Sequence, residues 1–130
     1  MQKLKLILKF LLAMFFVLAG FNHFFHTAFY LHIMPPYLPW PLPLVYVSGL
    51  FEILLGILLL VPKFTRIAAW GLIALLIAVF PANIHMAINH DVYPEYSAVA
   101  LWIRLPLQLV LVGWTSWYAI PFARSRRVAT

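Results

Sequence analysis

The segment from Leu44 to Val61 constrains the fold of this chain most, because its 18 residues include a single charged residue, Glu52. An α-helix of that length is about 27 Å long, close to the hydrocarbon thickness of a lipid bilayer. A carboxyl group at membrane depth costs on the order of 3 kcal/mol unless it is neutral or has a partner. The rest of the chain must therefore provide a polar environment for Glu52.

Three other segments have a similar length and a similar apolar character, at about residues 4–25, 67–87 and 98–120. The chain is 65% hydrophobic and only 9% charged, whereas charged residues make up about 25% of an ordinary soluble domain. We therefore predict an all-α membrane protein with one domain over residues 1–130. In this fold the three segments and residues 44–61 form an antiparallel bundle of four transmembrane helices.

The basic residues indicate the orientation of these helices. Eight of the nine Lys and Arg residues lie at the start of the first segment, between the second and third, and after the fourth: Lys3, Lys5, Lys9, Lys63, Arg66, Arg124, Arg126 and Arg127. Cytoplasmic loops of membrane proteins are enriched in Lys and Arg, so we expect a multi-pass plasma-membrane protein with both termini cytoplasmic. The loop with Asp91 and Glu95 would then lie outside. The net charge of +6 does not indicate nucleic-acid binding, because the basic residues flank apolar segments and form no soluble basic face.

Residues 27–43 separate the first two helices and contain five of the ten prolines. Prolines at this density favour extended or polyproline-like backbone. The aromatic residues of this segment suit the membrane interface. We expect an extended outer loop, either a cap over the mouth of the bundle or a plain interfacial linker.

Polar residues from all four segments fall in the outer half of the predicted bundle. They form the candidate ligand-binding set: Asn22, His23, Ser48, Glu52, Asn83, His85, Arg104 and Gln108. Glu52 and Arg104 are each costly alone at membrane depth, so we predict that they meet or share a network. The cluster is either a structural pair that fixes helix register or a site for a polar headgroup, a proton or a redox carrier.

Metal binding and thiol chemistry have little support in the sequence. The chain contains no cysteine, which excludes thiolate ligation by this chain. Its histidines form no Glu-x-x-His pair of the kind found in carboxylate-bridged metal sites: His23, His26, His32, His85 and His90. No haem, flavin or nucleotide motif is recognisable. We therefore predict no metal site and no intrinsic cofactor.

Three motifs resemble those of the DoxX family of small four-helix membrane proteins. They are Gly20-Phe21-Asn22-His23-Phe24, Ser48-Gly49-x-x-Glu52-x-x-x-Gly56 and Val79-Phe80-Pro81-Ala82-Asn83-Ile84-His85-Met86. The similarity extends from about Leu6 to Tyr118. The resemblance implies a membrane subunit associated with redox enzymes, and it provides no catalytic residue to carry over.

These observations favour an accessory or quinone-interacting subunit of a membrane redox system, with the lipid bilayer and a redox-enzyme subunit as partners. Quinone carbonyls need hydrogen-bond donors at membrane depth, and Arg104, His23, Asn83 and His85 can supply them. One alternative is a protein that binds lipid or a small hydrophobe, or an isomerase that uses Glu52 as acid and base. Another is a purely structural subunit. Homo-oligomer formation is left open.

Overall fold

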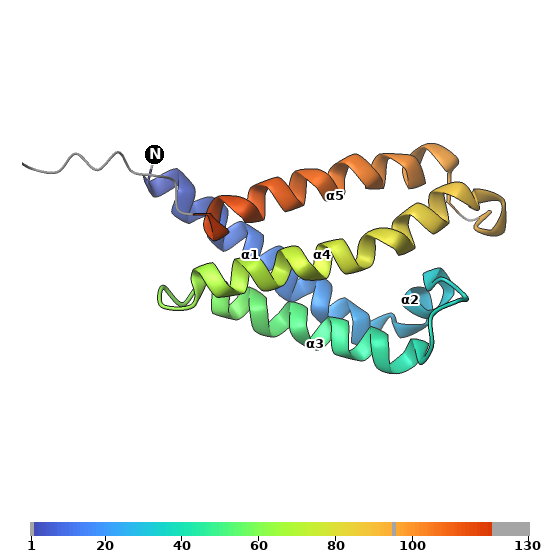
Figure 1. Ribbon diagram of the computed structural model, residues 1–130, viewed down its shortest axis with the longest axis horizontal. Helices are drawn as coiled ribbons and strands as arrows, with labels where there is room; N and C mark the ends of the chain where they lie inside the picture. Colours follow the sequence, from blue (N-terminus) through green and yellow to red (C-terminus); the bar gives the residue numbers. More distant parts are fainter. Residues whose placement is uncertain (1, 95, 121–130) are drawn as a thin grey trace, which may run out of the picture.

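The computed structural model describes residues 2–94 and 96–120, and the regular secondary structure of these ranges is helical (Figure 1). The described residues form four long α-helices, one short α-helix and one 3-10 turn: α1 (Gln2–Phe25), α2 (Thr27–Ile33), α3 (Pro41–Leu59), α4 (Thr65–Ile88), η1 (His90–Val92) and α5 (Ala98–Ala119). Each long helix has the length and apolar composition needed to cross a membrane. The prediction of an all-α protein with four candidate membrane spans is confirmed.

The ends of the long helices differ from the predicted ends by at most three residues. Two of the long helices contain a proline, Pro81 in α4 and Pro106 in α5. Four of the charged residues used to predict the orientation lie outside the described residues: Glu95, Arg124, Arg126 and Arg127.

The prediction that residues 27–43 form an extended loop is wrong at both ends of that segment. Residues Thr27–Ile33 form α2, and the Thr27 hydroxyl donates to the carbonyl of His23, 2.9 Å away. The last three residues of the segment form the first turn of α3, which begins at Pro41. Proline fits there because the first turn of a helix needs no N–H donors and proline has a helical φ.

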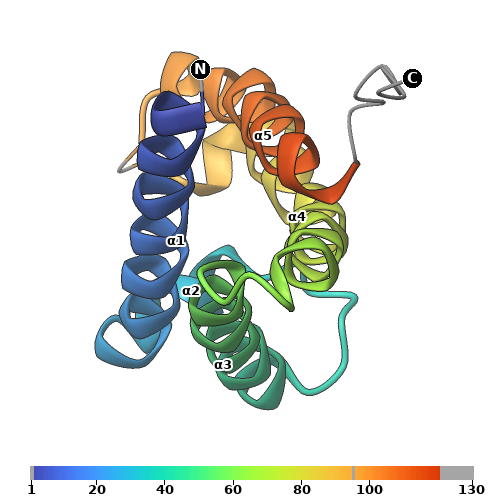
Figure 2. The same cartoon turned by 90° about the vertical axis from the view of Figure 1, so that its left-hand side faces the viewer.

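Small residues determine how closely α1 and α3 pack. A Cβ added at Gly20 would lie 2.6 Å from the carbonyl oxygen of Gly49, and one added at Gly56 would lie 2.9 Å from Val17. The two backbones are therefore closer than larger side chains would allow, as at other membrane helix interfaces. Helix α4 packs against α5 and α3, so the four long helices surround a shared interior (Figure 2).

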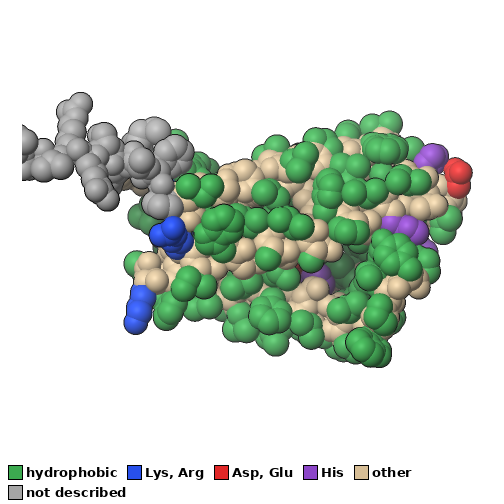
Figure 3. Space-filling model, viewed as in Figure 1, with side chains coloured by type: hydrophobic (Ala, Val, Ile, Leu, Met, Phe, Trp, Pro, Cys, Tyr) green, Lys and Arg blue, Asp and Glu red, His purple; other side chains and the backbone are tan. Residues whose placement is uncertain are grey.

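The two ends of the molecule differ in charge. Lys and Arg side chains lie at one end, where α1 begins and α3 connects to α4, and the described acidic surface residue lies at the other (Figure 3). We call the first the basic end, defined by Lys3, Lys5, Lys63 and Arg66. We call the opposite end, which holds α2 and η1, the α2 end. Most large side chains between the two ends are exposed and apolar, as a lipid-facing surface requires.

Candidate functional site

The candidate site is built around Glu52, whose carboxylate faces α1. Its Oε2 lies 3.5 Å from Nδ1 of His23, and the two side chains are only 13% and 9% exposed. Gly49 lies one turn before Glu52 on α3, and a Cβ there would be 2.7 Å from Cβ of His23. The close approach of α1 and α3 therefore brings the imidazole and the carboxyl group together.

The Glu52 carboxyl group is incompletely satisfied. Nδ1 of His23 lies 2.8 Å from the carbonyl oxygen of Ala19. A carbonyl can only accept, so Nδ1–H donates to Ala19 and not to the more distant Glu52. The buried Oε2 of Glu52 has no hydrogen-bond partner among the described residues. Because an unpaired buried polar atom costs about 1–3 kcal/mol, this oxygen is a candidate contact for a ligand or a proton.

Tyr30 completes the site and was not predicted. Its ring stacks on that of His23, with centroids 3.9 Å apart and planes 16° apart. Its hydroxyl oxygen accepts a hydrogen bond from Nδ2 of Asn22 at 2.8 Å. Burial raises the pKa of Tyr30, and the hydrogen bond from Asn22 partly opposes this. The phenol is therefore neutral at physiological pH and keeps its own proton available for donation.

Helix α2 is what brings Tyr30 to this position. Ile33, in its last turn, is buried with Met86 of α4 and Leu101 of α5. The segment therefore packs against α4 and α5 at the α2 end of the molecule. The sequence spacing held a signal for Tyr30, because it follows Asn22 by eight residues and would share its face in a continuing helix.

Glu52 and Arg104 were predicted to meet or to share a network. Within residues 2–94 and 96–120, no ion pair joins them, and the imidazole of His23 lies beside the Glu52 carboxyl group. The two charges act on a common neighbour instead. Glu52 raises the pKa of Tyr30 and Arg104 lowers it, although both effects are smaller than that of burial. Tyr30 therefore lies within electrostatic range of both.

Asn83 and Gln108 meet each other at the interface between α4 and α5. Nδ2 of Asn83 donates to Oε1 of Gln108, and Nε2 of Gln108 donates to the carbonyl of Leu76. Both side chains are buried. Leu76 is followed by Ile77, and the carbonyl of Ile77 has no helical hydrogen bond because Pro81, four residues later, has no N–H. These amides therefore satisfy each other and link two helices across a proline-containing turn.

The other two predicted residues lie at the edges of the cluster. Ser48 is half-buried, one turn before Glu52 on α3. His85 has its Nδ1 3.3 Å from Nδ2 of Asn89, and its ring packs edge-on against Tyr37 and Tyr93. His85 thus belongs to the aromatic contacts at the α2 end. Over the described part of the chain, no three His, Asp or Glu side chains are grouped closely enough to hold a metal ion.

The molecular surface is hollowed near the middle of the molecule. Figure 3 shows this hollow between α3 and α4, with a histidine side chain visible inside it. Its rim is apolar. A ligand with an apolar body and a polar group would suit such a surface.

Comparison with known proteins identifies the family. The chain belongs to the family described as Domain of unknown function (DUF8561), whose model matches residues 12–119. No curated protein and no solved structure matches the chain. The matched range includes every residue of the candidate site, and the resemblance to the DoxX family stays a prediction.

Proposed function

We propose that this member of the DUF8561 family is an integral membrane protein that binds a quinone beside Glu52, as an accessory subunit of a membrane redox system. The observation that supports this proposal is the buried Oε2 of Glu52, which has no hydrogen-bond partner among the described residues. A ligand that donates a hydrogen bond to this oxygen would offset the cost of its burial.

The surrounding groups can recognise both redox forms of a quinone. A quinol hydroxyl can donate to the carboxylate of Glu52, and a quinone carbonyl can accept from the phenol of Tyr30. That phenol already accepts from Asn22, which leaves its proton free to be donated to the ligand. Electrons would come from or go to a partner enzyme, and the resemblance to the DoxX family favours such a partner.

We also propose that the four long helices form an antiparallel transmembrane bundle in the plasma membrane, with both termini cytoplasmic. The supporting observation is the collection of Lys and Arg side chains at the basic end. In this orientation the Glu52 site lies in the outer half of the bundle, beneath α2.

A second candidate function uses the same carboxyl group for chemistry. A buried Glu with an open oxygen can remove and return a proton, so the protein could isomerise a lipid or another small hydrophobe. In that case lipid that co-purifies with the protein would be identified by mass spectrometry, and Glu52→Gln would abolish turnover and leave the bound lipid in place.

The quinone proposal is tested by titrating purified protein in nanodiscs with a short-chain ubiquinone analogue and with its quinol, and following quenching of tryptophan fluorescence. We expect Glu52→Gln to weaken binding of the quinol about tenfold or more, because it replaces the carboxyl oxygen that would accept from the quinol hydroxyl. Arg104→Leu should also weaken binding by removing the positive charge within range of Tyr30.

Thr115→Val is the matched control. Thr115 is fully buried, and its hydroxyl donates to Leu111 within α5, close to the basic end. We expect quinone affinity to stay within twofold of wild type in this variant. Absence of quinone binding to the wild-type protein would refute the proposal, and equal losses in Glu52→Gln and Thr115→Val would show that the site lies elsewhere.

A further inference from the structure

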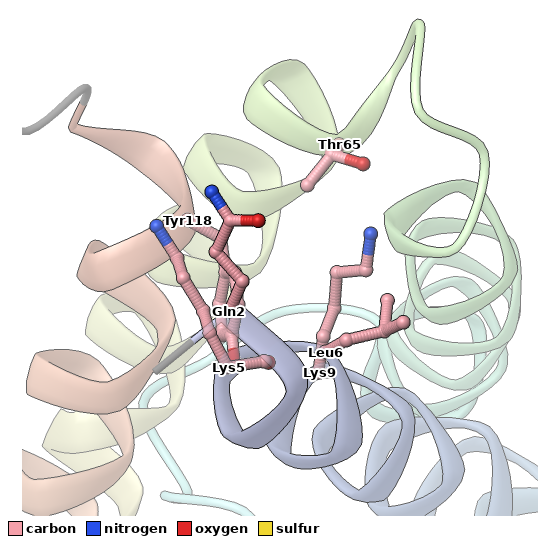
Figure 4. A pocket seen from close by; sticks show the side chains of 6 residues that line it. All are labelled: Gln2, Lys5, Leu6, Lys9, Thr65 and Tyr118. Carbon is pink, nitrogen blue, oxygen red and sulfur yellow. The ribbon is translucent and has the colours of Figure 1, made fainter.

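A second concavity lies at the basic end, far from Glu52 along the helices. It has a volume of about 400 Å³, within the range of small-ligand pockets. Three helices contribute its lining residues: Gln2, Lys5, Leu6 and Lys9 of α1, Thr65 of α4 and Tyr118 of α5. Figure 4 shows Lys5 and Lys9 of α1 extending to different sides, with Gln2 between them and Thr65 across from α1.

The charge of this pocket calls for an anion. Lys5 and Lys9 are four residues apart on α1, and both line the pocket. Among the described residues neither lysine takes part in an ion pair. An anion in the pocket would offset the charge of both ammonium groups.

The pocket wall positions these cations. The Lys5 ammonium lies 5.3 Å from the ring centroid of Trp117 and 5.7 Å from that of Tyr118. The Tyr118 hydroxyl donates to the backbone carbonyl of Lys5 at 2.8 Å, which joins α5 to α1 at this end. The first turn of α4, with its unpaired N–H groups and positive dipole end, begins at Thr65. Its N-cap residue, Phe64, makes no side-chain cap hydrogen bond.

We propose that this pocket binds the phosphate group of an anionic phospholipid. Two ammonium groups and an amide line the pocket beside a helix N-terminus, and phosphate oxygens accept from such donors. Leu6 lines the pocket and is 50% exposed, and the neighbouring Phe10 is 51% exposed. The pocket is therefore continuous with an apolar helix face on which acyl chains can lie, which favours a lipid over a free phosphate. This site is independent of the proposed quinone site.

The test is native mass spectrometry of the full-length protein, titrated with phosphatidylglycerol, phosphatidylcholine or sodium phosphate. We expect the wild-type protein to bind phosphatidylglycerol more tightly than phosphatidylcholine. The double variant Lys5→Gln/Lys9→Gln should weaken binding of phosphatidylglycerol about tenfold or more, because it removes both ammonium groups that line the pocket.

Lys63→Gln/Arg66→Gln is the matched control, because it removes two charges from the same end without altering the pocket lining. We expect less than a twofold change in this control, and retained binding in Lys5→Arg/Lys9→Arg, which keeps both charges. Equal losses in the two Gln doubles, or equal binding by the Arg and Gln doubles, would overturn the site. Binding of inorganic phosphate with the same lysine dependence, and no preference for phosphatidylglycerol, would overturn its assignment to a lipid.

Discussion

At the scale of single residues, Tyr30 is the contact that closes the candidate site. Its ring stacks on His23, and its hydroxyl oxygen accepts a hydrogen bond from Asn22. The ring and the hydroxyl group therefore each contribute a contact to the site. Each of these interactions contributes on the order of 1 kcal/mol. Because Tyr30 belongs to α2, its side chain also couples the position of this short helix to the Glu52 site.

Tyr30→Phe should separate these two contributions. The variant keeps the stacked ring and leaves Nδ2 of Asn22 without its acceptor, so we expect a loss of about 1 kcal/mol in the free energy of unfolding. Unfolding in mixed detergent micelles, followed by circular dichroism, measures the change.

Tyr46→Phe is the matched control for this prediction. Tyr46 also stacks on an aromatic ring of α1, that of Phe24, but its side chain is 41% exposed. Loss of its hydroxyl should change stability by less than about 0.5 kcal/mol. Equal effects of the two substitutions would contradict the role assigned to the hydrogen bond between Asn22 and Tyr30.

At the scale of helices, the interface between α1 and α3 brings Glu52 and His23 together. Gly20 and Gly49 allow the two backbones to approach, and the carboxyl and imidazole groups lie beside them. In the sequence, Ser48, Glu52 and Gly56 are four residues apart and form one stripe along a helix, and the small residues beside Glu52 indicate that it faces protein. The stripe could not show which helix provides the partner, because that depends on how each helix is rotated about its axis.

Gly49→Ala should force α1 and α3 apart. The added Cβ would lie 2.7 Å from Cβ of His23 and 2.9 Å from the carbonyl oxygen of Gly20. Neither atom can move away without a shift of the α1 backbone. We expect destabilisation of about 1–3 kcal/mol, measured by the same detergent unfolding experiment.

Gly113→Ala tests whether this effect arises from packing. A Cβ at Gly113 of α5 meets nothing within 4 Å. Because alanine has the higher helix propensity, this variant should be neutral or more stable by up to about 1 kcal/mol. A destabilisation as large as that of Gly49→Ala would show that neither effect comes from the α1–α3 contact.

At the scale of the whole molecule, the charge difference between the two ends relates the fold to a membrane. The basic end carries the ammonium groups of α1 and of the connection to α4, whereas Asp91 lies in η1 at the α2 end. This arrangement predicts opposite accessibility of the two ends in a cell. It also separates the proposed phospholipid pocket from the Glu52 site.

Single-cysteine labelling measures this topology without background, because the natural chain contains no cysteine. We expect Asp91→Cys to react with a membrane-impermeant maleimide in intact cells, and Lys63→Cys to react only after the cells are lysed. The cysteine-free protein should not be labelled under either condition. Labelling of both positions from outside would contradict the proposed orientation.

The sequence by itself determined the four candidate spans and the separation of charge, because both follow from which residues are close along the chain. Helix length and apolar composition need no knowledge of neighbours. Only the tertiary structure decided that Glu52 meets His23 and not Arg104, that Asn83 pairs with Gln108, and that residues 27–33 form a helix carrying Tyr30. Each of these outcomes depends on helix rotation and packing, which determine the distances between side chains that are far apart in sequence.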